Sequence, residues 1–178
     1  LVISTVPLPM LLGKLLPPID SLADARSAAQ GLKYLDMIFV LFIVKRKIIS
    51  GDNWLYFPEP DLVFNRGYEA KSFDPEMAPD DRSVLCLEIT VEPNGQLGHE
   101  SDESILDLVR EQITKTGLFS SKEIDEEHVY RLPYAYPLYT IDYDLRLARV
   151  FRGLRAIRNL ITIGRQGLFN HNNMDHSI

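Results

Sequence analysis

Two short runs of apolar, β-branched residues lie at opposite ends of the 178-residue chain, LVIST at 1–5 and LITIG at 160–164. Short continuous apolar runs of this kind are typical of buried strands in parallel sheets. A chain that leaves one such strand at residue 5 and returns to another at residue 160 has the pattern of a domain inserted into a second domain. We therefore expect the intervening residues to form one sheet-and-helix unit, with most of the second domain lying outside this chain.

The intervening segment contains several strand patterns separated by turn residues. In SVLCLEITV, alternation places Leu85, Leu87 and Ile89 on one face. The predicted strands are 33–48, 53–57, 61–70, 83–91 and a short one near 128–132. Strands joined by turns favour an antiparallel meander.

Four segments have helical patterns. Ser101 precedes two acidic residues and an apolar stripe, which predicts an N-cap, and Ser21 is predicted to cap a second helix. The predicted helices are 10–16, 21–32, 101–119 and 143–159, and residues 133–143 are predicted to be irregular and aromatic. The buried stripe of the third helix is predicted to comprise Ile105, Leu108, Val109, Gln112 and Ile113. The predicted fold class is α+β, a mainly antiparallel sheet with packed helices.

Composition argues against two kinds of partner. The formal net charge is −6 and the pI is about 5.2, and no basic stripe is present that could neutralise nucleic-acid phosphates. The longest apolar run, at 37–44, is far shorter than the roughly 20 residues that a membrane span needs. The single cysteine, Cys86, lies in an apolar run, where we expect it to be buried in the core. Its lack of a disulfide partner fits a reducing, cytoplasmic location.

The C-terminal run GRQGLFNHNNMDHSI, residues 164–178, follows the second apolar strand. It has the pattern of a strand, a glycine turn, a loop and a new helix that begins at Asn173, Met174 and Asp175. Glycines at 164 and 167 leave room for a ligand to approach backbone N–H groups.

This run resembles the C-terminal flavin-contacting motif of the FAD-dependent oxidoreductases in the amine oxidase, protoporphyrinogen oxidase and UDP-galactopyranose mutase-like superfamily. VISTVPLP resembles the strand and loop by which that family leaves its FAD domain. WLYFPEPDLVFNRGYEAKSF, VLCLEITV and YRLPYAYPLYTIDY resemble its substrate domain in the same order. The resemblance implies an exit segment at 1–9, a substrate-binding domain at 10–159 and a return to a Rossmann-like FAD domain at 160–178.

The resemblance also implies a cofactor site. Gly164 and Arg165 fall where the family approaches the FAD pyrophosphate and ribityl chain, and Met174 and Asp175 fall where a helix start faces the flavin pyrimidine edge. The implied cofactor-binding set is Gly164, Arg165, Gly167, Asn173, Met174 and Asp175. The mutases carry a tyrosine near the second aromatic position, but here Phe169 is followed by Asn170 and His171. This departure argues against a mutase-type substrate site.

Five residues are predicted to bind a small-molecule substrate: Arg66, Tyr134, Tyr136, Tyr139 and His171. The guanidinium of Arg66 would suit a phosphate or carboxylate, or it forms an ion pair with Glu69 or Glu88 instead. The three tyrosines form either a rigid wall beside the flavin ring or ordinary packing in a proline-rich connection. His171 either polarises the substrate or lies on the surface.

Trp54 and Tyr56 fit core or sheet-face packing, and no catalytic residue is evident. His171 and His176 are five residues apart with no third ligand in view, so no metal site is predicted.

The dinucleotide fingerprint GxGxxG occurs nowhere in the sequence. We therefore expect this chain to be a fragment whose FAD-binding half lies upstream, and to be inactive alone. The predicted function is the substrate pocket of a FAD-dependent oxidoreductase. Two alternatives are a UDP-galactopyranose mutase-type sugar isomerase and a non-catalytic binding module derived from the same fold.

Overall fold

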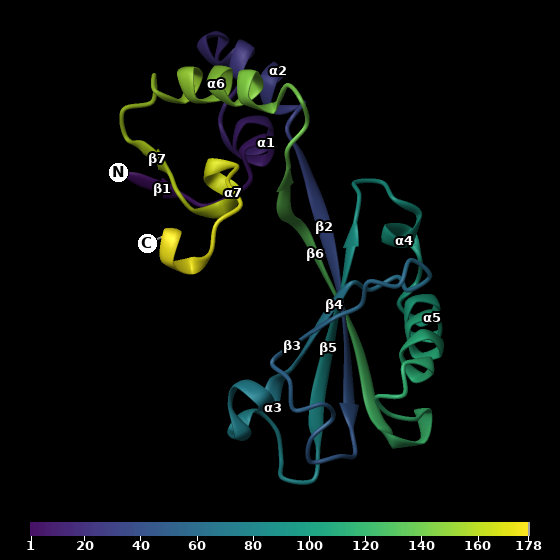
Figure 1. Ribbon diagram of the computed structural model, residues 1–178. Helices are drawn as coiled ribbons and strands as arrows, with labels where there is room; N and C mark the ends of the chain where they lie inside the picture. The colour runs from purple at the N-terminus through teal and green to yellow at the C-terminus, as the bar shows by residue number, and fades with distance from the viewer. Residues whose placement is uncertain (178) are drawn as a thin grey trace. The chain divides into compact units, whose positions relative to one another are not determined.

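A computed structural model describes residues 1–177, except for the side chain of Leu15 (Figure 1). The chain divides into two compact units, Leu1–Leu35 with Pro133–Ile178, and Asp36–Leu132. The boundaries 1–9, 10–159 and 160–178, which the family resemblance implies, stay a prediction.

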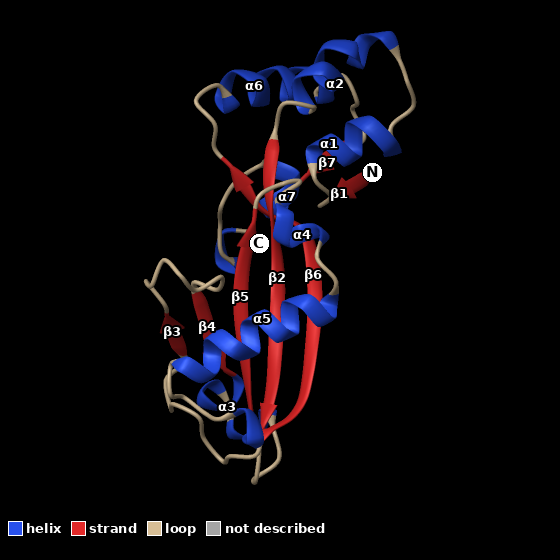
Figure 2. Cartoon of the chain, turned by 90° about the vertical axis from the view of Figure 1, so that its right-hand side faces the viewer, coloured by secondary structure: helices blue, strands red, loops and turns tan. Residues whose placement is uncertain are grey.

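A five-stranded sheet has the strand order β3-β4-β5-β2-β6 (Figure 2). Its strands are β2 (Lys33–Val44), β3 (Trp54–Tyr56), β4 (Arg66–Glu69), β5 (Ser83–Val91) and β6 (Ile124–Leu138). The pairs β3–β4, β4–β5 and β2–β5 are antiparallel, which confirms the predicted α+β class. The meander prediction holds only for β3 to β5. β2 lies between β5 and β6, because a strand that is apolar on both faces is stabilised most in the interior of a sheet.

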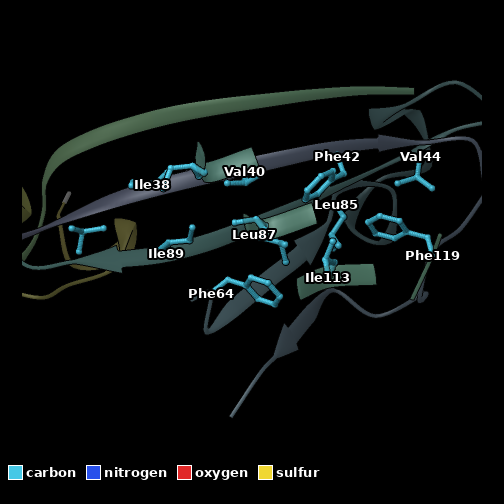
Figure 3. Packing of buried hydrophobic residues seen from close by; sticks show 13 residues of the cluster. Ile38, Val40, Phe42, Val44, Phe64, Leu85, Leu87, Ile89, Ile113 and Phe119 are labelled. Carbon is cyan, nitrogen blue, oxygen red and sulfur yellow. The ribbon is translucent and has the colours of Figure 1, made fainter. Parts of the chain in front are cut away.

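The core of the Asp36–Leu132 unit lies between this sheet and α5 (Asp102–Lys115), which crosses one face of the sheet in Figure 2. Alternate residues of β2 and β5 point into this core, as predicted for β5 (Figure 3). They meet the buried side chains of Ile105, Val109 and Ile113. Ser101 is the predicted N-cap, since its hydroxyl accepts a hydrogen bond from the Ser104 N–H at 3.2 Å.

In the other unit, β1 (Val2–Ser4) and β7 (Leu160–Thr162) form a parallel pair, with Val2 opposite Leu160 and Ser4 opposite Thr162. The two terminal apolar runs are therefore strands, as predicted, but the expectation that they are buried was wrong within this chain, since Val2, Ile3 and Ile161 are exposed. The helices are α1 (Leu8–Met10), a π-helical turn (Leu11–Leu15), a 3-10 turn (Asp20–Leu22), α2 (Ala23–Ala29), α6 (Tyr143–Leu154) and α7 (Gly164–Leu168). α2 and α6 lie side by side (Figure 1), and their buried faces form the core of this unit together with Leu8, Leu12 and Phe169.

Several predicted boundaries were wrong. β4 begins only at Arg66, because the Val63 N–H is bonded to the side chain of Gln112 instead of to a neighbouring strand. β6 extends to Leu138 and so takes up the first part of the stretch 133–143 predicted to be irregular, although Pro133 and Pro137 lie within it. Ser21 lies inside a 3-10 turn and does not cap α2.

Short helical turns also occur outside the predicted helices: α3 (Ala70–Phe73), α4 (Gln96–His99) and 3-10 turns at Pro75–Met77 and Ser121–Glu123. Within the described range, none of the helices combines the length and the apolar character that crossing a membrane requires.

Candidate functional site

The C-terminal motif starts directly after β7. α7 (Gly164–Leu168) occupies the segment predicted to be a glycine turn, and Phe169 ends the helix in the left-handed region with φ 51°. The helix predicted to start at Asn173 is, within the described residues, a single 3-10 turn, Met174–His176, with Asn173 at its N-cap position. Met174 and Asp175 are exposed there.

The two glycines of the motif have different roles. Gly164 has φ +75°, and a Cβ built on it would meet no atom within 4 Å, so open space lies beside this backbone. A Cβ on Gly167 would lie 2.9 Å from the carbonyl oxygen of Ser4. Gly164 therefore leaves room for a ligand, whereas Gly167 is required for close packing of α7 on β1.

Arg165 connects the glycine motif to the predicted substrate residues. Its Nε and Nη2 donate to the carbonyl oxygen of Asn172 at 3.1 and 2.6 Å. Its Cζ lies 4.7 Å from the ring centroid of Tyr136, within cation–π range. The ring of His171 packs edge-on against Tyr136 at 4.9 Å. Arg165, Tyr136 and His171 thus form one stack, called the Arg165 stack below.

Tyr139 lies next to this stack. Its hydroxyl accepts a hydrogen bond from the His171 N–H at 2.7 Å. Its ring packs against Tyr143 at 4.6 Å and against Phe169 at 5.9 Å. The structure therefore brings together four of the residues predicted from sequence: Arg165, Tyr136, Tyr139 and His171.

Tyr134 belongs to a neighbouring aromatic contact centred on Tyr34. The rings of Tyr134 and Phe169 both meet Tyr34 edge-on, at 5.4 and 5.0 Å. The Tyr34 hydroxyl donates to the carbonyl oxygen of Gln166 at 2.9 Å, and burial raises the pKa of this hydroxyl. Sequence reasoning missed Tyr34, because it lies in a strand whose aromatic and apolar residues all fit a core.

Two aromatic residues of this region have left-handed backbone conformations, Tyr134 with φ 58° and Phe169 with φ 51°. For residues other than glycine this conformation costs about 1–2 kcal/mol each. Both side chains pack on Tyr34, and their packing holds the strained backbone in place. Strain of this kind is concentrated at functional sites.

Arg66, in the Asp36–Leu132 unit, lies directly opposite Glu88 in the β4–β5 register. Its Nε and Nη2 donate to Glu88 Oε2 at 2.8 and 2.5 Å, and its Cζ lies 4.8 Å from the Trp54 ring centroid. The ion pair with Glu88 considered in the sequence analysis is thus present. Glu69, the other candidate partner, is buried elsewhere.

Trp54 packs on the sheet face against Tyr68 and Phe73, at 5.5 and 5.8 Å, and is 44% exposed, so it is not a core residue. Tyr56 is more exposed still. Cys86 is buried as predicted, and burial raises its pKa to about 11. Over residues 1–177, no group of three or more His, Cys, Asp or Glu side chains is placed to hold a metal ion.

A hollow of about 470 Å³ lies beside the motif, where the end of α6 meets β7. Its walls are apolar, apart from two arginines and a threonine. It is lined by Phe151, Leu154, Arg155, Ile157, Arg158, Leu160, Ile161, Thr162 and Leu168.

No model of a protein family matches the chain, and no curated protein sequence matches it. Solved structures do match. A reduced UDP-galactopyranose mutase has a TM-score of 0.85 and 22% identity, covering 98% of this chain and 38% of the mutase chain. The chain has the fold of part of this enzyme.

Two further solved structures share the fold. A candidate protoporphyrinogen oxidase from Exiguobacterium sp. 255-15 has a TM-score of 0.69 and 21% identity over 92% of this chain and 36% of its own. An oxidoreductase from Methanosarcina mazei has a TM-score of 0.58 and 18% identity, covering 94% of this chain and 37% of its own. These neighbours are of the kinds that the sequence resemblance named, so the resemblance is confirmed at the level of the fold. The chain spans less than two fifths of the length of these structures.

Proposed function

We propose that this chain forms the part of a FAD-dependent oxidoreductase that shapes the substrate pocket over the flavin ring. The observation that carries the proposal is the Arg165 stack. It puts a residue from the flavin-like motif in direct contact with Tyr136 and, through Tyr136, with His171. Residues assigned to the cofactor and to the substrate therefore lie in contact with one another.

The residues around the motif fit a bound FAD. Gly164 leaves open space beside its backbone. The buried hydroxyl of Ser4 has no hydrogen-bond partner among the described residues, and an unsatisfied buried polar atom is costly. Gly164, Arg165 and Ser4 would hold the cofactor in this proposal, with Asn173, Met174 and Asp175 at the following turn. Gly167 would support the site by keeping α7 against β1.

FAD, when bound, supplies a ring that accepts or returns a pair of electrons. The residues of this chain would orient the substrate and exclude water. Tyr136 and Tyr139 offer apolar ring area with a polar tip, which suits a pocket wall. The imidazole of His171 can donate or accept a hydrogen bond to the substrate. Arg66 belongs to the Asp36–Leu132 unit, and any contribution it makes to substrate binding would be made as half of an ion pair with Glu88.

We further propose that a dinucleotide-binding domain completes the enzyme, and that these 178 residues alone are inactive. β1 and β7 support this, since a parallel pair is stable mainly within a larger covered sheet, and Val2, Ile3 and Ile161 are exposed. A cytoplasmic location is proposed on the ground of the single unpaired thiol, Cys86.

A second candidate function is flavin-dependent sugar isomerisation of the UDP-galactopyranose mutase type. The mutase similarity, with a TM-score of 0.85 over 98% of this chain, favours it. The replacement of the mutase tyrosine by Asn170 and His171 counts against it. A third candidate is a non-catalytic binding module that has kept the fold and lost the cofactor.

The test is the visible absorption spectrum of the longest natural polypeptide that contains these residues, purified without added flavin. We expect the absorption bands of bound flavin, and their bleaching by a reductant. In the same background, Arg165→Ala should weaken FAD binding about tenfold, the order of one lost charge-assisted hydrogen bond. Arg152→Ala is the matched control, because Arg152 is exposed on α6 in the same unit and does not line the hollow beside the motif.

The outcomes separate the three candidates. Bound flavin whose reduction by a small-molecule substrate is impaired in His171→Ala and Tyr136→Ala supports the oxidoreductase. Isomerisation of the sugar of UDP-galactopyranose in the presence of reduced flavin, without net oxidation, supports the isomerase. A colourless polypeptide that also does not bind added FAD refutes the oxidoreductase and the isomerase, and leaves the binding module as the remaining candidate.

A further inference from the structure

A second hollow, of about 400 Å³, lies in the Asp36–Leu132 unit, between the last turn of α5 and the segment 55–62. This volume lies within the usual range of small-molecule sites. It is lined by Leu55, Tyr56, Phe57, Glu59, Asp61, Leu62, Gln112, Lys115, Thr116 and Leu118. Neither the proposed flavin function nor the Arg165 stack uses any of these residues.

The walls of this hollow, called the α5 pocket below, are held in place. The Gln112 side chain accepts from the Val63 N–H at 2.9 Å and donates to the Asp61 carbonyl at 2.9 Å, which ties segment 61–63 to the helix. The Phe57 ring packs edge-on against buried Phe64 at 4.8 Å. The pocket is therefore preformed, and a ligand would need little reorganisation to enter it.

The electrostatics of the α5 pocket favour a cation. The C-terminal end of α5 contributes Gln112, Lys115 and Thr116, and the carbonyl end of a helix attracts positive charge. Across residues 1–177, the carboxylates of Glu59 and Asp61 form no hydrogen bond or ion pair with another side chain. The one cation of the lining, Lys115, is paired with Glu111 on the helix surface at 2.6 Å.

The apolar part of the lining restricts the ligand further. Leu55, Phe57, Leu62 and Leu118 offer aliphatic and aromatic surface, which a bare ion would leave uncovered. We propose that the α5 pocket binds a small organic ammonium compound. Its apolar body lies against these four side chains, and its ammonium group faces Glu59, Asp61 and the end of α5.

The experiment uses three probes with one indole ring and different head groups: tryptamine, tryptophol and indole-3-acetate. Each is titrated into the ¹⁵N-labelled chain, and binding is followed by the shifts of the Gln112 side-chain amide and the Thr116 and Gly117 amides. Tryptamine should bind most tightly and indole-3-acetate least. Each carboxylate should contribute about fivefold, the size of one charge pair about 4 Å apart in water.

Variants test the cause of this preference. Glu59→Gln with Asp61→Asn should bring tryptamine to within about twofold of tryptophol, leaving tryptophol unchanged. The control Glu76→Gln with Asp80→Asn removes two exposed carboxylates of the same unit and should leave the preference intact. Thr116→Trp, at an exposed position of the lining, should fill the pocket and abolish the shifts of the Gln112 side-chain amide and the Gly117 amide with tryptamine and with tryptophol.

Three results would overturn the proposal. They are equal binding of the amine and the alcohol, shifts that map away from α5, and an unchanged preference after removal of the two acids.

Discussion

Replacing Glu69 by glutamine tests how a fully buried carboxylate organises the Asp36–Leu132 unit. Glu69 is 0% exposed and accepts five hydrogen bonds. Oε1 accepts from the Ile49 N–H at 2.7 Å and the Ser83 hydroxyl at 2.6 Å. Oε2 accepts from the N–H groups of Ser50 and Gly51, at 2.8 and 3.0 Å, and from the Ser50 hydroxyl at 3.2 Å. One side chain therefore holds the turn between β2 and β3.

Glutamine has the same shape, but its NH₂ group would face a backbone N–H donor in either orientation of the amide: that of Ile49, or those of Ser50 and Gly51. With the amide toward Ser83, whose hydroxyl can turn to accept, the Ile49 N–H is left without a partner. An orphaned buried donor costs about 1–3 kcal/mol, and the remaining bonds lose their charge assistance. We expect Glu69→Gln to lower the free energy of unfolding by about 2–4 kcal/mol, a large part of the total for a domain of this size.

Urea unfolding followed by the fluorescence of Trp54, which lies in β3 just after the turn, measures this loss. Ser83→Ala removes one donor and should cost about 1 kcal/mol. Glu76→Gln changes an exposed carboxylate and should cost nothing measurable. Glu69→Gln within about 0.5 kcal/mol of the Glu76 control would refute the reasoning.

The pH dependence gives the same prediction a second readout. Burial alone would raise the pKa of Glu69, but the hydrogen bonds from Ser83, Ser50, Ile49 and Gly51 outweigh burial and lower it. Because the folded pKa lies below the unfolded value of roughly 4.3, the stabilisation is present above that value and is lost as the pH falls through the folded pKa. In Glu69→Gln this part of the acid destabilisation should be absent.

Three further predictions concern single positions. Gly153→Ala should lower stability by about 1–3 kcal/mol in thermal unfolding, because its Cβ would lie 2.5 Å from the Ala25 Cβ and force α2 and α6 apart. Ser101→Ala should cost about 1 kcal/mol in urea unfolding, since the Ser104 N–H loses its acceptor. Cys86 should react with a thiol reagent at mildly alkaline pH only after urea unfolds the chain, because burial raises its pKa to about 11; fast reaction of the native protein would contradict this.

The sequence predicts the main elements of the fold because the physical signals for them are local. Alternation in 83–91 identifies both the strand and its buried face, and Ser101 marks the start of α5. Strand order is not local. β2 and β3 are neighbours in sequence but not in the sheet, and no turn signal shows that β2 pairs with β5. The extent of β4 depends on the hydrogen bond that the Val63 N–H donates to the side chain of Gln112, 49 residues further along the chain.

The sequence selects some of the residues that lie together at the candidate site, but it does not give their geometry. The motif resemblance selects Arg165, and the aromatic, proline-rich stretch selects Tyr136 and Tyr139. The position of Arg165 over Tyr136 depends on the path of β6 through Pro133 and Pro137. Judged by residue type alone, these two prolines favour an irregular segment and not a strand. The left-handed conformations of Tyr134 and Phe169 leave no sequence signal, because both occur in residues that normally avoid them.

Arg66 shows where sequence reasoning could have gone one step further. Side chains alternate between the two faces of a strand, so residues 66 and 69 of β4 point to opposite faces, and the pattern alone excludes Glu69 as a partner within the strand. Choosing Glu88 requires the β4–β5 register, which only the folded sheet gives. The consequence is functional. In the sequence, Arg66 is a candidate to attract a phosphate or carboxylate by its charge, whereas in the sheet Arg66 and Glu88 form a pair with no net charge. Arg66 would therefore orient a substrate through its hydrogen-bonding geometry and its contact with Trp54 rather than attract one by net charge.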